Sequence, residues 1–392
     1  MKIVHICLGG GWYEKNAYQD QLLPRYHRRL GHEVTVVASY YGRWNLGKNC
    51  YDLDKTREVI LTDGIKLVRI KPFFPLKINA HVNLFCGLKR VIEKEKPDLI
   101  FLHGLVCLNY IQIAKYKKHN NNVKIVCDNH ADWNNSLHHW STRLWSKIVI
   151  RRWLVKKLIP ITECFYGVTP LRCDFLIKEY GVPRSKVKLL VLGADDDSMR
   201  LESRGEIRKT IREKNGITND DFLVVSGGRI NMKKSDYFLS LATAINNIDE
   251  KNLKLLIFGP VANNVVPLFK KFDSSRILLA GEVAANRVYD FFFASDIVVF
   301  PGLHSVMWEQ AVASKVPCVF HRIEGFDHVD FGGNCLWVDE DTHEQYQRVI
   351  ERILNDGETY KSMYLKATSC GAEKFLYSKI AEKVIDDVYK QK

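Results

Sequence analysis

Short apolar runs, each followed by glycine and then by a helical pattern, recur along the whole chain. The first run, Lys2–Leu8, leads directly into three glycines. A second series of such runs begins at Phe222–Ser226, after a polar break at Gly193–Gly205. Short buried runs of this kind are typical of parallel strands joined by crossover helices. The alternation therefore predicts an α/β protein with two Rossmann-like, doubly wound domains.

The length of 392 residues agrees with two domains, because one hydrophobic core seldom extends over so long a chain. We expect the first domain at residues 1–195 and the second at residues 196–370. The remaining segment, 371–392, is predicted to form a final amphipathic helix. Its apolar side would carry Leu376, Ile380, Val384 and Val388.

The stretch from Asp296 to Phe320 predicts an anion site. It reads as a buried strand, a turn at Pro301-Gly302, a short helix and a second strand. Ser305 is placed to cap a helix that starts near Val306 and carries the single acid Glu309. A helix start at the carboxyl end of a parallel strand favours anionic ligands. The acid has a second interpretation, since a carboxylate there also favours the helix dipole.

A glycine-rich loop follows the first strand of the second domain. Gly227 and Gly228 open it, and Arg229 and Lys234 supply two cations before the next helix. Two fixed positive charges on such a turn suit a diphosphate. They could equally be two ordinary surface cations. In the first domain, Gly9–Gly11 allows the same two interpretations, a tight turn or a loop near a phosphate or sugar.

The positive charge is concentrated in the first half of the chain. Residues 1–192 hold 32 Lys and Arg against 15 Asp and Glu, a net of +17, whereas the rest has a net of −4. Two segments, Gly64–Val91 and Trp133–Thr162, contain no acid, and in both aromatic side chains lie among the cations. We expect contact with an anionic membrane there, although a partly buried helix would also fit. The candidates are Lys71, Phe73, Phe74, Lys77, Arg143, Trp145, Lys147, Arg151 and Arg152.

The cysteines, the apolar runs and the acidic residues indicate which classes of protein and which kinds of site are not expected. The ten cysteines form no C-x-x-C pair, so we expect free buried thiols. No run of 18 apolar residues occurs, and the start resembles a first strand more than a signal peptide, which favours the cytoplasm. Acids at Asp128, Asp132 and Asp195–Asp197 show no ligand spacing, and no metal is expected.

Four short motifs carry a resemblance to a known family. Gly227–Lys234 is similar to a G-R-x-x-x-x-K-G element, and Trp308–Pro317 is similar to an E-A-x-A-x-G-x-P element. Gly181–Pro183 and Gly193–Asp195 resemble a G-V-P and an N-G-V-D element. The chain resembles a retaining glycosyltransferase of the GT-B fold, of the broad family 4 type that makes bacterial surface polysaccharides. That fold has a cleft between its domains and a last helix that crosses back onto the first.

The resemblance implies roles for single residues. Arg229 and Lys234 would hold the donor diphosphate, and His130 would lie by the donor sugar. Glu309 would bind the ribose, although counting back from Pro317 points to Gln310. The donor-binding set is then Gly10, Gly11, Arg229, Lys234, Gly281, Val283, Ser305, Val306 and Glu309. The second glutamate that the family carries eight residues before the ribose acid is absent, since Pro301 stands there.

The resemblance also implies a function. It is the transfer of a hexosyl or related group from a UDP- or GDP-sugar to a glycan or lipid-linked acceptor, at the inner face of the plasma membrane. No cofactor, metal or nucleic acid is implied. Three alternatives stay open: another GT-B enzyme such as a nucleotide-sugar epimerase or a phosphorylase, a non-catalytic donor-binding protein, and a nucleic-acid-binding protein that uses the basic half.

Overall fold

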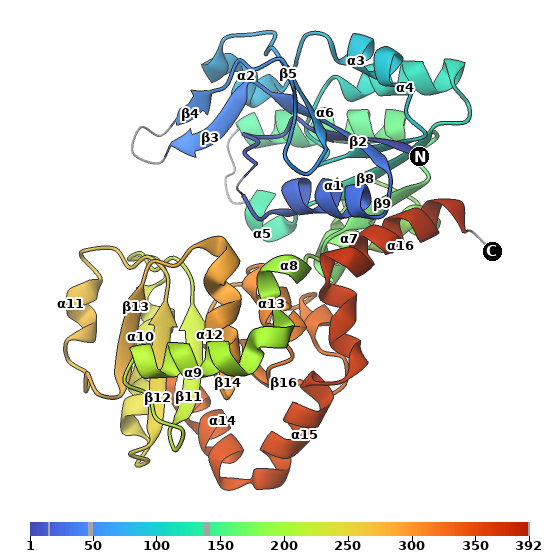
Figure 1. The fold of residues 1–392 in the computed structure, drawn as a ribbon. Coiled ribbons are helices and arrows are strands. Elements are labelled where there is room, and N and C mark those ends of the chain that lie inside the picture. Colours follow the sequence, from blue (N-terminus) through green and yellow to red (C-terminus); the bar gives the residue numbers. More distant parts are fainter. Residues whose placement is uncertain (15, 46–49, 137–141, 391–392) are drawn as a thin grey trace. The chain divides into compact units, whose positions relative to one another are not determined.

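The chain folds into two compact units (Figure 1). One unit comprises Met1–Leu192 together with Tyr377–Lys392, and the other comprises Gly193–Leu376. Each unit is built around its own parallel sheet and core, as the alternating sequence predicts. The computed structural model describes most of the chain, namely residues 1–14, 16–45, 50–136 and 142–390.

The first unit contains an eight-stranded sheet in the order β10-β9-β8-β7-β1-β2-β6-β5. Its neighbouring strands pair in parallel, except for β5, which pairs antiparallel with β6 at the edge. Strands β3 and β4 pair antiparallel in a separate two-stranded sheet. The strands are β1 (Lys2–Cys7), β2 (Glu33–Ser39), β3 (Tyr41–Asn45), β4 (Cys50–Leu53), β5 (Glu58–Ile60), β6 (Lys66–Ile70), β7 (Leu99–Leu102), β8 (Lys124–Asn129), β9 (Cys164–Gly167) and β10 (Val187–Leu189).

The helices of the first unit complete its core on either side of the sheet. They are α1 (Gln19–Arg29), α2 (Leu76–Val82), α3 (Leu88–Glu95), α4 (Tyr110–His119), α5 (Trp133–Ser136), α6 (Thr142–Leu158), α7 (Pro170–Lys178) and α16 (Tyr377–Tyr389). The last helix, α16, comes from the far end of the chain. Its side chains Ile380, Val384 and Val388 are buried against α1 and the sheet, in one cluster with Leu22 and Tyr26.

The second unit is a six-stranded parallel sheet in the order β13-β12-β11-β14-β15-β16. The strands are β11 (Phe222–Gly227), β12 (Leu253–Phe258), β13 (Ile277–Gly281), β14 (Ile297–Phe300), β15 (Cys318–His321) and β16 (Cys335–Val338). The helices are α8 (Asp196–Met199), α9 (Arg204–Lys214), α10 (Ser235–Asn247), α11 (Val266–Phe269), α12 (Val288–Ala294), α13 (Met307–Ala313), α14 (His343–Asn355) and α15 (Gly357–Ala367).

Strand order reverses once within each sheet. In the first unit the chain proceeds outward from β1 in one direction and then restarts on its other side with β7. In the second unit the reversal lies between β11 and β14. Ligands of open α/β sheets bind outside the carboxyl ends of the strands at such a reversal. The loops after β1, β7, β11 and β14 are therefore the places where a site is expected.

The last predicted helix differs from the structure at its start. Within the expected segment 371–392, the helix begins only at Tyr377, because a 3₁₀ segment at Cys370–Phe375 precedes it. The acid-free segment after Trp133 contains the short α5 and the longer α6, and residues 137–141 are outside the described part of the chain.

Candidate functional site

The loop after β11 packs very closely against the end of β12 and the residue that follows it. Glycine residues make this close approach possible. A Cβ on Gly227 would lie 2.3 Å from the ring of Phe258. A Cβ on Gly259 would lie 2.3 Å from the carbonyl oxygen of Gly228, and Gly259 also has φ +111°. The N–H of Gly259 donates to the carbonyl of Gly281 at 2.7 Å. These contacts fix the path of the backbone that leads into Arg229.

Arg229 and Lys234 lie at the same small cavity of the second unit. This cavity has a volume of about 50 Å³ and opens between the loop after β11 and the loop after β14. Both cations are exposed. The lining residues are Gly227, Gly228, Arg229, Lys234, Tyr237, Phe238, Phe300, Pro301, Leu303, Ser305 and Met307. The two sequence stretches that predict an anion site thus meet at the reversal point of the sheet.

The loop after β14 is shaped by Gly302 and held by hydrogen bonds. Gly302 has φ +78°, and a Cβ there would lie 2.5 Å from the ring of Tyr237. Its N–H donates to the Asp341 carboxylate at 2.8 Å. The predicted cap at Ser305 is wrong in detail, because Val306 is the N-cap of α13 and no side chain caps that helix. Ser305 uses its backbone carbonyl, which accepts from the N–H of Trp308 at 3.0 Å.

Glu309 points into the protein and has two histidine partners. Its side chain is fully buried, and its Oε1 lies 2.9 Å from His304 Nε2 and 2.8 Å from His328 Nε2. Burial alone would raise the pKa of this carboxyl group, but the two histidines outweigh it and hold the pKa well below its usual range. Glu309 has no surface to offer a ribose in this structure. Gln310, the other candidate, is only 5% exposed.

The same three side chains are the types that bind a divalent metal ion. Two imidazole nitrogens and one carboxylate form a donor set that zinc accepts. Both nitrogens lie at hydrogen-bond distance from the same oxygen, so two N–H···O hydrogen bonds hold the group together. Glu309 Oε2 and His328 Nδ1 are buried without a hydrogen-bond partner. The local role of the group is to join α13 to the loops that carry His304 and His328.

The first unit places its predicted residues at the carboxyl edge of its own sheet. Gly10 and Gly11 follow β1, and His130 follows β8. His130 Nε2 lies 3.6 Å from the carboxylate of Asp128, which also accepts from His103 Nδ1 at 2.9 Å and from the N–H of Gly104 at 2.7 Å. Burial would raise the pKa of Asp128, yet His103 and His130 lower it well below its usual range.

Comparison with known sequences decides the family. The profile described as Glycosyltransferase Family 4 matches residues 21–198, and that described as Glycosyl transferases group 1 matches residues 207–369. The chain belongs to the family 4-like glycosyltransferases with the GT-B fold. The matched residues include both units and both loops of the cavity, so the resemblance read from single motifs is confirmed.

Solved structures share the fold of this glycosyltransferase at low sequence identity. A glycosyltransferase of Rickettsia africae has a TM-score of 0.68 at 14% identity, and the match covers 98% of this chain and 97% of that one. Alr3699/HepE of Anabaena, solved in complex with UDP, has a TM-score of 0.68 at 13% identity, with 98% and 99% covered. These likenesses confirm the predicted two-domain Rossmann-like architecture.

A curated relative is more similar in sequence but is matched only in part. The uncharacterized glycosyltransferase MJ1059 of Methanocaldococcus jannaschii is 23% identical over 282 residues. The match covers 69% of this chain and 63% of that protein, which is less than two thirds of its length.

Val283 lies apart from the cavity that the two cations line. It borders another cavity of about 200 Å³, together with Lys214, Arg287 and Asp290. Gly281 has a structural contact instead, because its carbonyl receives the N–H of Gly259. Of the predicted donor-binding residues in the second unit, Arg229, Lys234 and Ser305 share one cavity, and Val306 begins the adjoining helix.

The predicted membrane residues are exposed in part. Phe73 is 59% exposed, beside Phe74 and ahead of α2. Trp153 on α6, which is not among the predicted residues, is 47% exposed. Arg152 has a protein partner, since it forms an ion pair with Glu179 at 2.7 Å. The side chains of Arg143, Trp145 and Lys147 are outside the described part of the structure. Within the described part, no helix is long and apolar enough to cross a membrane.

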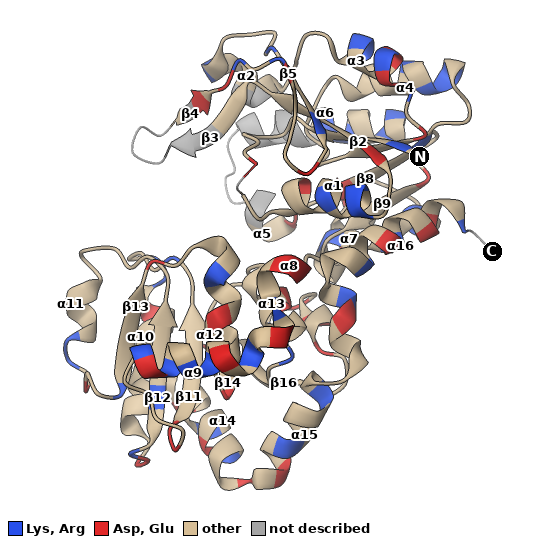
Figure 2. Cartoon of the chain, viewed as in Figure 1, with Lys and Arg blue, Asp and Glu red and all other residues tan. Residues whose placement is uncertain are grey.

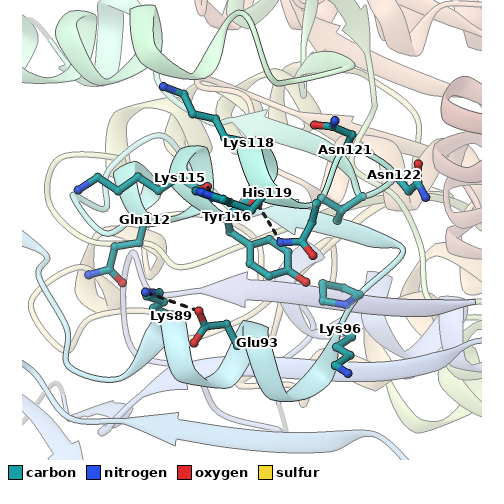
Figure 3. Close-up of a pocket in the computed structure, with 13 residues that line it drawn as sticks. Lys89, Glu93, Lys96, Gln112, Lys115, Tyr116, Lys118, His119, Asn121 and Asn122 are labelled. Carbon is teal, nitrogen blue, oxygen red and sulfur yellow. Dashed lines mark hydrogen bonds and ion pairs between the residues drawn. The ribbon is translucent and has the colours of Figure 1, made fainter.

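A further cavity lies in the first unit, away from the carboxyl edge of the sheet. It has a volume of about 1110 Å³ and is bordered by α3, α4 and the segments that precede β7 and β8 (Figure 3). Its cations lie on and beside these two helices (Figure 2). Lys118 and His119 lie in the last turn of α4, where positive charge stabilises the helix dipole. Lys89 is paired with Glu93 at 3.6 Å.

Several residues of these sites are not predicted by the sequence motifs. His304 and His328 are separated by 24 positions, and nothing local indicates that both contact Glu309. Tyr237 and Met307 line the cavity but belong to ordinary helical patterns. A usable signal is the presence of histidine within or directly after apolar strand runs, as for His5 and His103.

Proposed function

We propose that the protein transfers a sugar, with retention of configuration, from a nucleotide-diphosphate sugar to a glycan or lipid-linked acceptor. One observation carries the proposal. Arg229, Lys234 and two glycine-opened loops converge on a single cavity, at the strand reversal where α/β proteins bind ligands. The UDP complex of Alr3699/HepE supports a uridine diphosphate sugar as the first donor to test.

The proposed chemistry is electrostatic. Breaking the glycosidic bond leaves negative charge on the diphosphate, which two fixed cations and nearby backbone N–H groups stabilise. Arg229 offers several donors in a rigid fork, whereas Lys234 acts as a point charge. A metal is not required for this stabilisation, so activity should persist in excess EDTA. In the first unit, Gly10, Gly11 and His130 are the residues we propose for the acceptor side and the transferred sugar.

Nucleoside diphosphates are expected to stabilise the second unit against heat. A ligand that binds only the folded state at 100 times its Kd adds about 2.7 kcal/mol. For a unit of this size that corresponds to a rise in Tm of roughly 5–10 °C. The measurement is thermal unfolding with UDP, GDP, ADP and their sugar derivatives at millimolar concentration. The matched nucleoside monophosphates should give smaller shifts, because they lack the second phosphate.

Two results, one from this panel and one from product analysis, would contradict the proposed transfer reaction. Equal shifts with mono- and diphosphates would remove the diphosphate role of the two cations. Incubation of the protein with a nucleotide sugar alone, followed by product analysis, separates transfer from epimerisation. An epimerised donor formed without any acceptor would identify the epimerase instead.

We also propose that the first unit contacts an anionic membrane surface while it binds its acceptor. Phe73 and Trp153 are exposed in the basic, acid-free segments, and apolar rings among cations are typical of interfacial binding. Burying one such ring stabilises binding by about 1.5–3 kcal/mol, or roughly 10- to 100-fold.

Phe73→Ala and Trp153→Ala are therefore expected to weaken sedimentation with phosphatidylglycerol vesicles at least tenfold. Leu365→Ala, an exposed apolar residue of the second unit, is the matched control and should change nothing. Equal binding to neutral vesicles, or no loss in either variant, would contradict membrane contact through these rings.

A further inference from the structure

A continuous chain of hydrogen bonds runs through the first unit. Asp128 on β8 contacts His103 after β7 at 2.9 Å, and His103 Nε2 contacts His5 Nδ1 on β1 at 3.0 Å. His5 Nε2 then contacts His27 Nδ1 on α1 at 3.0 Å, and His27 Nε2 contacts the carbonyl oxygen of Ala381 at 3.3 Å. We call these four side chains, from Asp128 to His27, the histidine chain. Its first end is at the carboxyl edge of the sheet, and its other end is α16.

The histidine chain is buried and its rings are held in place. Asp128, His5 and His27 have no exposed surface, and His103 is 7% exposed. The ring of Phe101 stacks on His5 with centroids 5.4 Å apart and on His103 with centroids 4.4 Å apart. Water therefore cannot substitute for a missing hydrogen bond, and each link has to contain its own hydrogen.

Counting hydrogens shows that the histidine chain needs one more than neutral imidazoles supply. There are four links: carboxylate to His103, His103 to His5, His5 to His27, and His27 to the Ala381 carbonyl. Neither terminal acceptor brings a hydrogen of its own. Three neutral imidazoles provide three N–H groups. Four links therefore require one imidazolium, whose charge balances the buried carboxylate of Asp128.

Every link is satisfied when the additional proton is on His103. In that arrangement His103 donates from both nitrogens, and His5 and His27 each donate from Nε2. Burial lowers the pKa of His5 far below its ordinary value and that of His27 to about 3, so both are neutral while the charge of Asp128 is not compensated. The positive charge then lies on His103, beside Asp128. The interaction with this ring lowers the pKa of the Asp128 carboxyl group.

The charge can move without breaking any link. If the hydrogen between His103 and His5 shifts to His5, and the hydrogen between His5 and His27 shifts to His27, then His27 becomes the imidazolium. No bond to another group is made and no atom is lost. The hydrogen bond from His27 to Ala381 becomes charge-assisted, and such bonds are roughly twice as strong as neutral ones.

We propose that Asp128, His103, His5 and His27 form a proton relay that connects the carboxyl edge of the first sheet with α16. The relay holds one proton in excess of three neutral imidazoles, and its position depends on the charge at Asp128. A cation or proton that compensates Asp128 shifts the relay proton toward His27 and tightens the contact with Ala381. This proposal goes beyond the transfer reaction and does not rest on it.

Other ionisable groups face the relay and contribute to its field. Asp20 on α1 has a pKa raised by burial, and His103 and His130 lower it in part. Tyr110 on α4 donates its hydroxyl to the carbonyl of His103 at 3.3 Å. His32 lies with its ring centroid 6.3 Å from that of His27, and the Cys7 thiol on β1 has a pKa raised by burial.

The direct test counts ring hydrogens in the full-length protein. Long-range nitrogen–proton NMR of protein labelled with ¹⁵N-histidine distinguishes imidazolium, Nδ1–H and Nε2–H forms. At pH 7 we expect four protected ring N–H groups on His5, His27 and His103, with one imidazolium among them. Three such groups on three neutral rings would overturn the relay. This measurement needs no variant and so does not depend on the folding of one.

A matched pair of variants tests the dependence on Asp128. Asp128→Asn removes the charge, and its amide can donate an N–H to His103 Nδ1, so the side chain itself supplies the hydrogen of the first link. The imidazolium should then disappear, and the count of ring N–H groups should fall from four to three. His32→Gln changes a neighbouring ring outside the histidine chain and should leave the count at four. Hydrogen exchange of the α16 backbone should be the same in both variants, because His27 donates to Ala381 as a neutral imidazole with or without the Asp128 charge. An unchanged imidazolium in Asp128→Asn would refute the coupling to Asp128.

Discussion

Replacing Arg229 with alanine is expected to lower kcat/KM for sugar transfer by about 100-fold or more. The guanidinium lines the cavity at the strand reversal, where it can donate two parallel hydrogen bonds to a phosphate. Its removal leaves the leaving diphosphate with one cation in place of two. Arg229 is exposed, so the variant should keep the Tm of the unliganded protein. The measurement is steady-state transfer from UDP-glucose, or from the donor that the thermal panel identifies.

Neighbouring lysines provide a matched control for this effect. Lys234 lines the cavity, whereas Lys233, also exposed, is absent from its lining. Lys234→Ala should lose at least tenfold in kcat/KM and Lys233→Ala should lose less than twofold. Arg229→Lys should fall between wild type and Arg229→Ala, because it restores the charge without the fork. If Arg229→Ala retained full activity, or if all three alanine variants lost activity alike, the diphosphate role would be refuted.

The parts of the fold that the sequence predicts are those with a strong local signal. The strand expected at Phe222–Ser226 is β11, and the strand expected before the Pro301-Gly302 turn is β14. Both begin with an uninterrupted run of four apolar residues, and a glycine follows that run within two residues. The convergence of Arg229 and Ser305 also follows from sequence, because parallel strands bring their carboxyl ends to one edge.

The burial of Glu309 could not be predicted from the residues near it in the sequence. A single acid in the first turn of a helix is usually exposed, because it then meets both water and the helix dipole. Here every residue of α13 from Trp308 to Ala313 is buried, so the helix has no solvent face to receive the carboxylate. The two histidines that stabilise the buried carboxylate come from separate loops. Their proximity depends on tertiary packing and has no local signature.

The histidine chain also could not be predicted from the sequence, but for a different reason. His5 lies inside the apolar run of β1, where it reads as an interruption of a buried strand. His27 is on helix α1, and Asp128 is on strand β8. In the sheet, β7 lies between β8 and β1, the strand that carries His5. Only the strand order places the four groups in line. A buried histidine in a central strand is nevertheless a usable signal, because its ring needs two hydrogen-bond partners.

Acid sensitivity follows from the neutral histidines of the first unit. The pKa of His27 is lowered from 6.5 to about 3, first by burial and then by His32, and that of His5 is lowered in the same direction. In the unfolded chain both rings bind a proton below about pH 6.5. The folded state does not, so stability is complete above pH 6.5 and is lost as the pH falls toward 3. Carboxylates such as Asp128 act in the same direction only nearer pH 4.

The free energy of unfolding of the first unit is therefore expected to fall by about 2 kcal/mol between pH 6.5 and 4.5 for His27 alone, with a further loss of the same sign for His5. Urea unfolding at half-unit steps of pH measures it, and the slope gives the number of protons taken up. His27→Gln should reduce that slope by about one proton, because glutamine does not titrate. His119→Gln, an exposed histidine on α4, should leave the slope unchanged. A stability that is flat over this range, or an equal slope in His27→Gln, would show that the buried rings are protonated in the folded state, which is the opposite of what their burial predicts.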